Sequence, residues 1–204
     1  FKWYGGLSRK MLTRFSRIFV QDHDSLQLLE QIGLSNKVIV GGDTRFDRVL
    51  TIAHAQRLLP EIDAFIGTNK AIVVGSSWPD DEQLWSTQQN WLLDNQVKLL
   101  IVPHEIDAPH IESIEKKFPS AVRYTELKRN ASLQSWVIII DQIGLLSQLY
   151  LYGWVNYIGG GLNAGGVHNV LEAAVYGRPI ITGPRIEKYR EATELSNGNG
   201  LHTV

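Results

Sequence analysis

The chain has 204 residues, of which 44% are hydrophobic and 20% charged, an ordinary composition for a globular protein with a full hydrophobic core. Its formal net charge of −1 excludes the strongly basic surface on which nucleic-acid binding depends, so we expect no nucleic-acid partner. The absence of cysteine excludes disulfide bonds and thiolate zinc sites, and no run reaches the ~18 apolar residues of a membrane span.

The first part of the chain, residues 1–47, is typical of the end of one domain. Residues 1–17 mix aromatic with basic side chains, which indicates either a helix packed on another domain or a basic amphipathic helix on an anionic membrane surface. The next expected elements are a strand at 17–21, a helix at 22–31 with Gly33 as its stop, and a strand at 37–40. The polar segment 41–48 resembles a hinge between two lobes.

From residue 71 onwards, strand and helix patterns alternate to the end of the chain. Strands are expected at 71–75, 97–102, 122–124, 136–141, 155–158 and 179–182, and from 201. Helices are expected at 49–59, 78–95, 107–118, 144–152, 168–176 and 187–195, with a loose connection at 60–69. This alternation predicts an α/β fold with a doubly wound parallel sheet. Because the chain starts without Met and stops where a strand begins, we expect a piece cut at both ends.

A glycine-rich loop between a strand and a helix is the most informative stretch. It places five glycines within eight residues: Gly159, Gly160, Gly161, Gly165 and Gly166. Glycines let the backbone turn at positive φ and let a ligand approach the main chain. His168 and Asn169 are expected in the first turn of the following helix, whose unpaired N–H groups suit a phosphate. Glu172, on about the same face, could accept hydrogen bonds from a ribose diol. The alternative is that these glycines serve only packing.

Two familiar phosphate-binding patterns fit this loop poorly. Gly159, Gly161 and Ala164 match a loose G-x-G-x-x-A dinucleotide fingerprint, but the next strand ends at Thr182 without the acid that the fingerprint requires. A Walker A loop is absent, since no glycine is followed by Lys-Ser or Lys-Thr.

Polar residues also follow other expected strands. They are Ser76 and Ser77 with Trp78, then His104 and Glu105, and then Asp141. Since the carboxyl ends of parallel strands meet at one edge of a sheet, these residues should lie near the glycine loop, where such sheets bind ligands. For the serines and the acids after them, simple capping of the next helix is the alternative.

A metal site is the alternative interpretation of four residues that are close in sequence: His104, Glu105, Asp107 and His110. Their spacing matches no helical zinc pattern, and Pro109 interrupts the local helix. No G-x-S-x-G nucleophile elbow occurs, and no pair of carboxylates has a context that would separate its pKa values. We therefore predict no metal and no cofactor, and we assign no acid–base pair from these residues.

The order of these motifs resembles the carboxyl-terminal half of the 3-deoxy-D-manno-octulosonic acid (Kdo) transferases. The resemblance covers roughly residues 18–192 and is carried by IFVQDHDSLQLLEQIGL, VGGDTRFDRV, GSSWPDDE, IVPHEI, IIIDQIGLLSQLY and YIGGGLNAGGVHNVLEAAVYGRPIITGP. The most specific motifs are GDTRFDRV and the glycine run with its His-Asn and Leu-Glu-Ala-Ala. Many relatives have Ser and Phe where this chain has Gly161 and Leu162.

The resemblance implies the carboxyl-terminal, Rossmann-like lobe of a GT-B fold, preceded by the last elements of the other lobe. The expected domains are therefore residues 1–47, the tail of an acceptor lobe and a hinge, and residues 48–204, a donor-binding lobe truncated at its end. In this family the second lobe binds CMP-Kdo, while the first binds the lipid acceptor and supplies a glutamate base. Kdo passes to a lipid A precursor with inversion and without metal, on the cytoplasmic face of the inner membrane. This chain alone should bind donor and be nearly inactive.

The resemblance also implies a role for each candidate site residue. Gly160, Gly161 and the N–H groups near His168 and Asn169 would hold the CMP phosphate. Glu172 would bind the ribose hydroxyls. The strand ends would supply the remaining contacts: His104 and Glu105 to cytidine or Kdo, and Ser77 and Trp78 to the sugar side. The alternatives are another GT-B enzyme, such as a UDP-sugar transferase or a sugar-nucleotide 2-epimerase, and a non-catalytic nucleotide-binding module.

Overall fold

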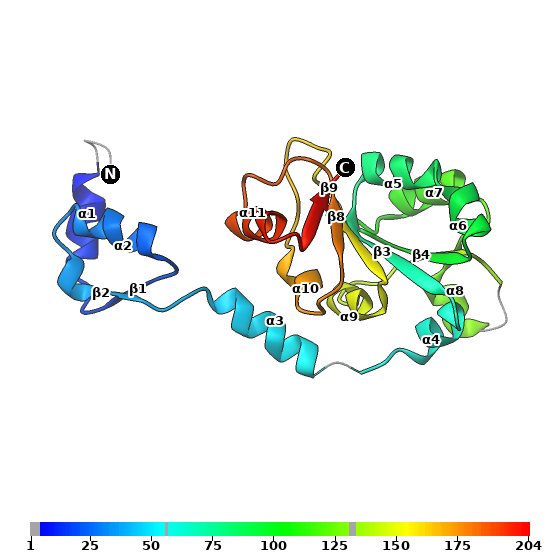
Figure 1. Ribbon diagram of the computed structural model, residues 1–204, viewed down its shortest axis with the longest axis horizontal. Helices are drawn as coiled ribbons and strands as arrows, with labels where there is room; N and C mark the ends of the chain where they lie inside the picture. Colours follow the sequence, from blue (N-terminus) through cyan, green and yellow to red (C-terminus); the bar gives the residue numbers. More distant parts are fainter. Residues whose placement is uncertain (1–4, 56, 131–133) are drawn as a thin grey trace. The chain divides into compact units, whose positions relative to one another are not determined.

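The computed structural model describes residues 5–55, 57–130 and 134–204. They divide into two compact units, Phe1–Leu50 and Thr51–Val204, and the division falls within helix α3 (Thr44–His54) (Figure 1). Whether the first unit is the end of an acceptor lobe stays a prediction.

The first unit contains a small parallel sheet. Strand β1 (Ile18–Val20) pairs with β2 (Val38–Val40), and α1 (Gly6–Leu12), α2 (His23–Glu30) and a 3₁₀ turn (Ser35–Lys37) complete it. The Asp22 side chain caps α2 by accepting a hydrogen bond from the Ser25 N–H at 2.7 Å. Gly33, at a φ of 76°, turns the chain after α2. The predicted strand–helix–strand pattern is confirmed.

Two predicted segments need correction. Helix α3 begins at Thr44, inside the expected hinge, where Asp43 accepts hydrogen bonds from the Arg45 N–H at 2.9 Å and from Arg45 Nε at 2.8 Å. Residues 60–69 are not a loose connection, because α4 (Pro60–Ile66) begins at a proline and buries Ile62, Phe65 and Ile66. The short helix α8 (Tyr124–Arg129) was not expected either.

The second unit is built on a seven-stranded, entirely parallel sheet in the order β5-β6-β4-β3-β7-β8-β9, which confirms the predicted doubly wound α/β fold. The strands are β3 (Lys70–Ser77), β4 (Val97–Pro103), β5 (Val122–Arg123), β6 (Val137–Ile139), β7 (Val155–Ile158), β8 (Ile180–Thr182) and β9 (Leu201–Thr203).

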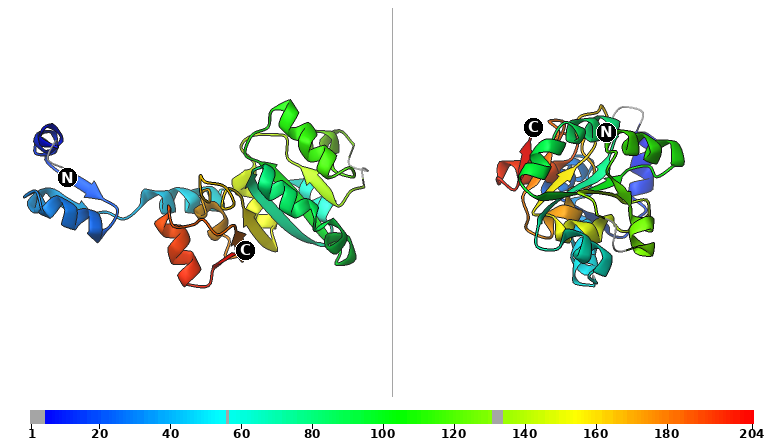
Figure 2. Two further views of the ribbon diagram at one scale, coloured as in Figure 1. Left: turned by 90° about the horizontal axis from the view of Figure 1, so that it is seen from above. Right: turned by 90° about the vertical axis from the view of Figure 1, so that its right-hand side faces the viewer.

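Helices cover both faces of this sheet (Figure 2). One face packs on α5 (Pro79–Ser86), α6 (Gln89–Asp94) and α7 (Ala108–Lys117). The other face packs on α4, α8, α9 (Leu146–Leu149) with its 3₁₀ turn (Tyr150–Tyr152), α10 (Leu171–Ala174) and α11 (Arg190–Asn197). Neighbouring residues of β4 accordingly enter opposite cores and are all buried, so the strand is a continuous apolar run rather than an alternating one.

The strand order reverses direction at the centre of the sheet. On one side of β3 lie β4, β6 and β5, which the chain forms first, and on the other side lie β7, β8 and β9, which follow. Between the carboxyl ends of β3 and β7 lies the crevice in which open α/β sheets bind ligands. None of the helices among the described residues is long and apolar enough to cross a bilayer.

Substitution of a glycine on β3 would test how tightly this core is packed. A Cβ at Gly75 would overlap the Tyr150 hydroxyl and lie 2.7 Å from Leu146 Cδ1. We expect Gly75→Ala to lower the free energy of unfolding by about 1–3 kcal/mol, since an overpacked core must shift. Urea denaturation measures the change. Gly198→Ala is the control, because its nearest atoms would lie at 3.5 and 3.7 Å, and equal stability of the two variants would contradict the packing described.

Candidate functional site

Three loops meet at the carboxyl edge of the sheet, beside the point where the strand order reverses. They follow β3, β4 and β7. The His104 N–H donates to Ser77 O at 3.0 Å, which joins the first two loops. The Gly159 N–H donates to Gly75 O at 2.9 Å, which joins the third loop to β3. The sequence placed its candidate residues on these same loops.

An aromatic stack spans all three loops. The Trp78 and His104 rings stack with centroids 4.6 Å apart, and the His104 and His168 rings stack at 4.5 Å. Trp78 Nε1 also donates a hydrogen bond to His168 Nε2 at 2.8 Å. The structure therefore brings together three predicted site residues that are up to 90 positions apart in the sequence.

The surroundings of the His168 ring favour its neutral form. Burial lowers its pKa most, the neighbouring His104 and the Lys188 ammonium lower it further, and Asp81 opposes them. An indole N–H can only donate, so Nε2 is the acceptor and the proton of the neutral ring lies on Nδ1. His168 thus offers one N–H donor at Nδ1.

A buried carboxylate that the sequence suggested only as a capping group organises the site. Asp81 is 1% exposed. Its Oδ1 accepts from the Tyr157 hydroxyl at 2.6 Å, and its Oδ2 accepts from the Trp78 N–H at 2.9 Å and the Gly160 N–H at 3.0 Å. A Cβ at Gly159 would lie 2.7 Å from Oδ2, so only glycine permits this approach. In the sequence, the only sign of this role is that an acid stands three residues after Trp78, at the start of the expected helix.

The glycines of the loop have a packing role. Gly160 has a φ of 89°, and a Cβ there would lie 2.6 Å from Gly166 O and 2.8 Å from the His168 ring. A Cβ at Gly161 would lie 2.7 Å from Gly183 N. The loop is therefore folded tightly on itself and on the turn that follows β8.

The predicted helix from residue 168 is wrong at its beginning, because α10 starts only at Leu171. The Asn169 side chain accepts from the Leu171 N–H at 3.1 Å, while the His168 N–H donates to Gly159 O at 3.2 Å. The amides of His168 and Gly160 consequently have partners within the protein. The N–H groups of Gly161 and Asn169 donate to no residue that the structure describes.

Glu172 and Asn169 lie together, as their spacing predicted. Asn169 Nδ2 donates to Glu172 Oε1 at 3.0 Å, at the start of α10. Glu172 is half-buried, and its other carboxylate oxygen accepts no hydrogen bond from the described part of the chain. This oxygen is thus open to a hydroxyl of a ligand.

The prediction for Ser77 needs correction. Its side chain is fully buried, and its hydroxyl donates to Glu82 Oε1 at 3.1 Å. Glu82 is also fully buried and is held by His110 Nε2 at 2.8 Å and Lys117 Nζ at 3.2 Å. Ser77 therefore joins the end of β3 to Glu82 of α5, which in turn contacts α7, and does not face a ligand. Its neighbour Ser76, at a φ of 51°, faces the pocket instead.

A pocket of about 340 Å³ opens at this edge of the sheet. Its polar lining comes from Ser76, His104, Glu105 and Gln142, and its apolar lining includes Pro103, Ile106 and Leu146. His104 and Glu105 thus line one hollow, as predicted. Asp141, at the end of β6, accepts from the Thr125 N–H at 3.0 Å and forms no part of this lining.

The ligand atoms of Glu105, Asp107 and His110 lie within 4.8 Å of one another. Two of these residues have structural roles, since Asp107 caps α7 by accepting from the His110 N–H at 3.1 Å and His110 Nε2 contacts Glu82. The prediction that no metal is needed stays a prediction.

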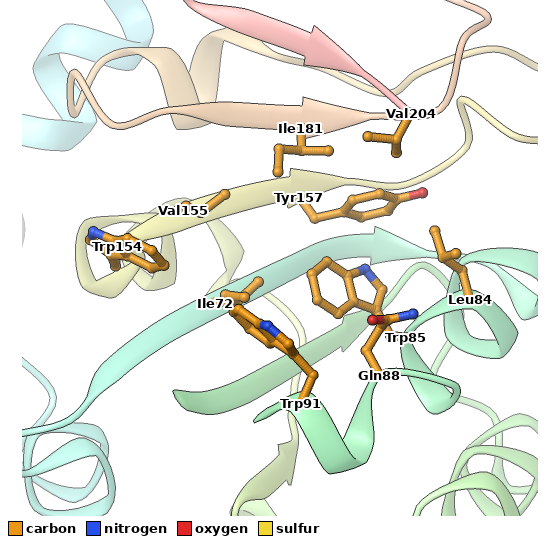
Figure 3. A pocket seen from close by; sticks show the side chains of 10 residues that line it. All are labelled: Ile72, Leu84, Trp85, Gln88, Trp91, Trp154, Val155, Tyr157, Ile181 and Val204. Atoms are coloured by element: carbon orange, nitrogen blue, oxygen red, sulfur yellow. The ribbon is translucent and has the colours of Figure 1, made fainter. Parts of the chain in front are cut away.

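A larger hollow of about 430 Å³ lies on the face of the sheet that carries α5 and α6 (Figure 3). Trp85, Trp91, Trp154 and aliphatic side chains line it, and the sequence did not suggest it. The only ionisable side chain of its lining is Tyr157, whose hydroxyl is bonded to Asp81. It therefore offers no groups for chemistry on a nucleotide.

Replacing Asp81, whose carboxylate organises the site, should destabilise the folded protein. We expect Asp81→Asn to lower the free energy of unfolding by about 2–4 kcal/mol, because its NH₂ group would face donors and leave buried N–H or O–H groups unpaired. Tyr157→Phe removes one of the three donors and should cost less. Urea denaturation of both variants tests this order, and an Asp81→Asn protein as stable as the wild type would contradict it.

The neutral state of His168 predicts a pH dependence. Because folding lowers its pKa below the ordinary value of 6.5, the unfolded chain binds the proton first as the pH falls. The contribution of His168 to stability is therefore complete above about pH 6.5 and is lost as the pH falls through the folded-state pKa.

As the pH falls from about 7.5 to 5.5, we expect the free energy of unfolding to decrease less in His168→Gln than in the wild type. His202→Gln, at an exposed position on β9, is the control and should keep the full loss. Equal pH profiles for all three proteins would contradict the assignment.

No protein-family model matches the chain. Curated relatives do: it is 25% identical to the 3-deoxy-D-manno-octulosonic acid transferase of Rickettsia felis, over 95% of this chain and 44% of that protein. It is 35% identical to the enzyme of the same name from Aquifex aeolicus, over 96% of this chain and 52% of that protein. The chain spans about half the length of the curated relatives it matches.

Solved structures show a similar fold. The C-terminal CMP-Kdo binding domain of WaaA from Acinetobacter baumannii matches with a TM-score of 0.60 at 18% identity, over 79% of this chain and 83% of that domain. A UDP-N-acetylglucosamine 2-epimerase matches with a TM-score of 0.62 at 16% identity, over 99% of this chain and 48% of that enzyme. The chain is therefore similar in sequence to 3-deoxy-D-manno-octulosonic acid transferases over nearly its whole length, and it shares its parallel α/β fold with these two solved structures.

Proposed function

We propose that this chain is the donor-binding half of a glycosyltransferase that moves Kdo from CMP-Kdo to a lipid A precursor in lipopolysaccharide synthesis. The observation that carries the proposal is the convergence, at the switch point of the sheet, of an aromatic stack, open backbone amides and a half-buried glutamate. The similarity to the Kdo transferases supports the reaction, and the similarity in fold to the CMP-Kdo binding domain of WaaA supports the donor.

The phosphate of the donor is proposed to lie at the glycine loop. The open N–H groups of Gly161 and Asn169 and the Nδ1–H of His168 are its donors, while the amide of Gly160 is held by Asp81 and keeps the loop in shape. The phosphate is the leaving group, and its negative charge grows in the transition state. Donors that are already in place stabilise that charge without reorganisation.

The nucleoside is proposed to lie between α10 and the pocket. Glu172 accepts hydrogen bonds from the ribose diol through its open oxygen. His104, Glu105 and the Trp78 ring contact the base or the sugar, and Ser76 takes the position first assigned to Ser77. A histidine–tryptophan stack gives such a site a flat, rigid wall.

The remaining features of the reaction belong to the whole enzyme and are part of the proposal. Transfer proceeds with inversion and without metal, the base is a glutamate outside this chain, and the isolated chain is nearly inactive. The intact enzyme works at the cytoplasmic face of the inner membrane, where its lipid acceptor lies. Residues 1–17, with their basic and aromatic side chains, are compatible with a position near that surface.

A second candidate is an enzyme that uses a UDP-sugar, such as a sugar-nucleotide 2-epimerase. The likeness in fold to the 2-epimerase over 99% of this chain favours it. Titration with CMP, UMP and UDP separates the two candidates: tightest binding of CMP supports the Kdo transferase, and tightest binding of UDP supports the alternative. A non-catalytic nucleotide-binding module is excluded if the chain, joined to an acceptor lobe, transfers Kdo to a lipid A precursor.

The ribose role of Glu172 can be measured directly. We expect Glu172→Ala to weaken CMP binding about tenfold, because hydrogen bonds to a charged acceptor are lost. 2′-Deoxy-CMP should bind weakly to the wild type and lose little further affinity in the variant. Glu112→Ala, at an exposed position on α7, is the control and should bind CMP like the wild type. Unchanged CMP affinity in Glu172→Ala would refute the ribose role.

A further inference from the structure

The turn that follows β8 lies directly against the glycine loop. The Arg185 N–H donates to Gly161 O at 3.1 Å, and the Val167 N–H donates to Arg185 O at 3.0 Å. These two bonds join residues 183–189 to both ends of the loop. The turn and the glycine loop therefore hold each other in place.

Lys188 extends from this turn over the glycine loop. Its Nζ donates to Gly165 O at 3.2 Å, and its stem would lie 3.8–3.9 Å from a Cβ placed at Gly166. The ammonium also lies 5.3 Å from the centre of the Tyr189 ring. No carboxylate of the described chain pairs with Lys188, so its charge is uncompensated. That charge is felt at His168, whose protonation it disfavours.

We propose that Lys188 binds the phosphate of the nucleotide donor, an inference that rests on the proposed function of the site. The Lys188 ammonium contacts the same loop that carries the amides of Gly161 and Asn169 and the Nδ1–H of His168, and it would complete a set of donors around one anion. The weak bond to Gly165 O holds the ammonium in place until the phosphate replaces or joins it. A charge-assisted hydrogen bond of this kind is among the strongest polar contacts a protein makes.

The test compares a nucleotide with its nucleoside. Lys188→Met keeps most of the stem but removes the charge, so CMP should bind about tenfold more weakly while cytidine binds unchanged. Lys188→Arg keeps the charge and should retain most of the CMP affinity. The salt dependence of CMP binding should become shallower in Lys188→Met alone, since one charged contact is lost. Lys116→Met, at an exposed position on α7, is the control and should bind CMP like the wild type.

Each contrary outcome overturns a particular statement. Equal loss of CMP and cytidine affinity in Lys188→Met would show that Lys188 only shapes the loop. Unchanged CMP affinity together with weaker binding of CMP-Kdo would assign Lys188 to the sugar carboxylate instead of the phosphate. Unchanged affinity for both would remove Lys188 from the site while leaving the proposed function intact. Failure of the wild type to bind CMP would overturn the proposed function itself.

Discussion

The candidate site depends on the hydrogen bonds that one buried carboxylate accepts from three separate segments. Asp81 accepts from the Trp78 N–H, the Gly160 N–H and the Tyr157 hydroxyl, which belong to the start of α5, the glycine loop and β7. A buried acceptor without its donors costs about 1–3 kcal/mol or more, so the loop and the helix hold each other in one geometry. Gly159 is required beside Asp81 because a side chain there would occupy the position of the carboxylate.

Glu82, the residue after Asp81, joins the same helix to a different neighbour. Glu82 is buried among Ser77, His110 and Lys117, and these contacts join the start of α5 to α7. Two successive acids thus connect one helix end to the glycine loop and to its neighbouring helix. This double attachment fixes Trp78, which then supports the imidazole rings of the stack without needing a ligand.

Some hydrogen-bonding groups of the glycine loop and its surroundings are bonded within the protein, and others are not. The amide of Gly160 is used to keep the loop folded, whereas the amide of Gly161 and the second oxygen of Glu172 bond to no residue that the structure describes. Lys188 adds a positive charge from the turn after β8. An anion and a diol are the groups that such a set complements, which agrees with a nucleotide whose phosphate lies at the loop and whose ribose lies at α10.

The sequence by itself determined the parallel α/β sheet and the strand ends at which the site lies, because apolar runs and glycine-rich turns are local signals. Tertiary structure decided the beginning of α10, before which the His168 N–H donates to Gly159 O of the glycine loop, and it decided the orientation of Ser77. The register of β3 shifts between Gly75 and Ser77, so the residue expected to face the ligand is turned into the protein. Only the structure shows the bonds of Asp81 to Tyr157 and Gly160 and of Lys188 to Gly165, because these partners lie far away in the chain and no local pattern of residues records them.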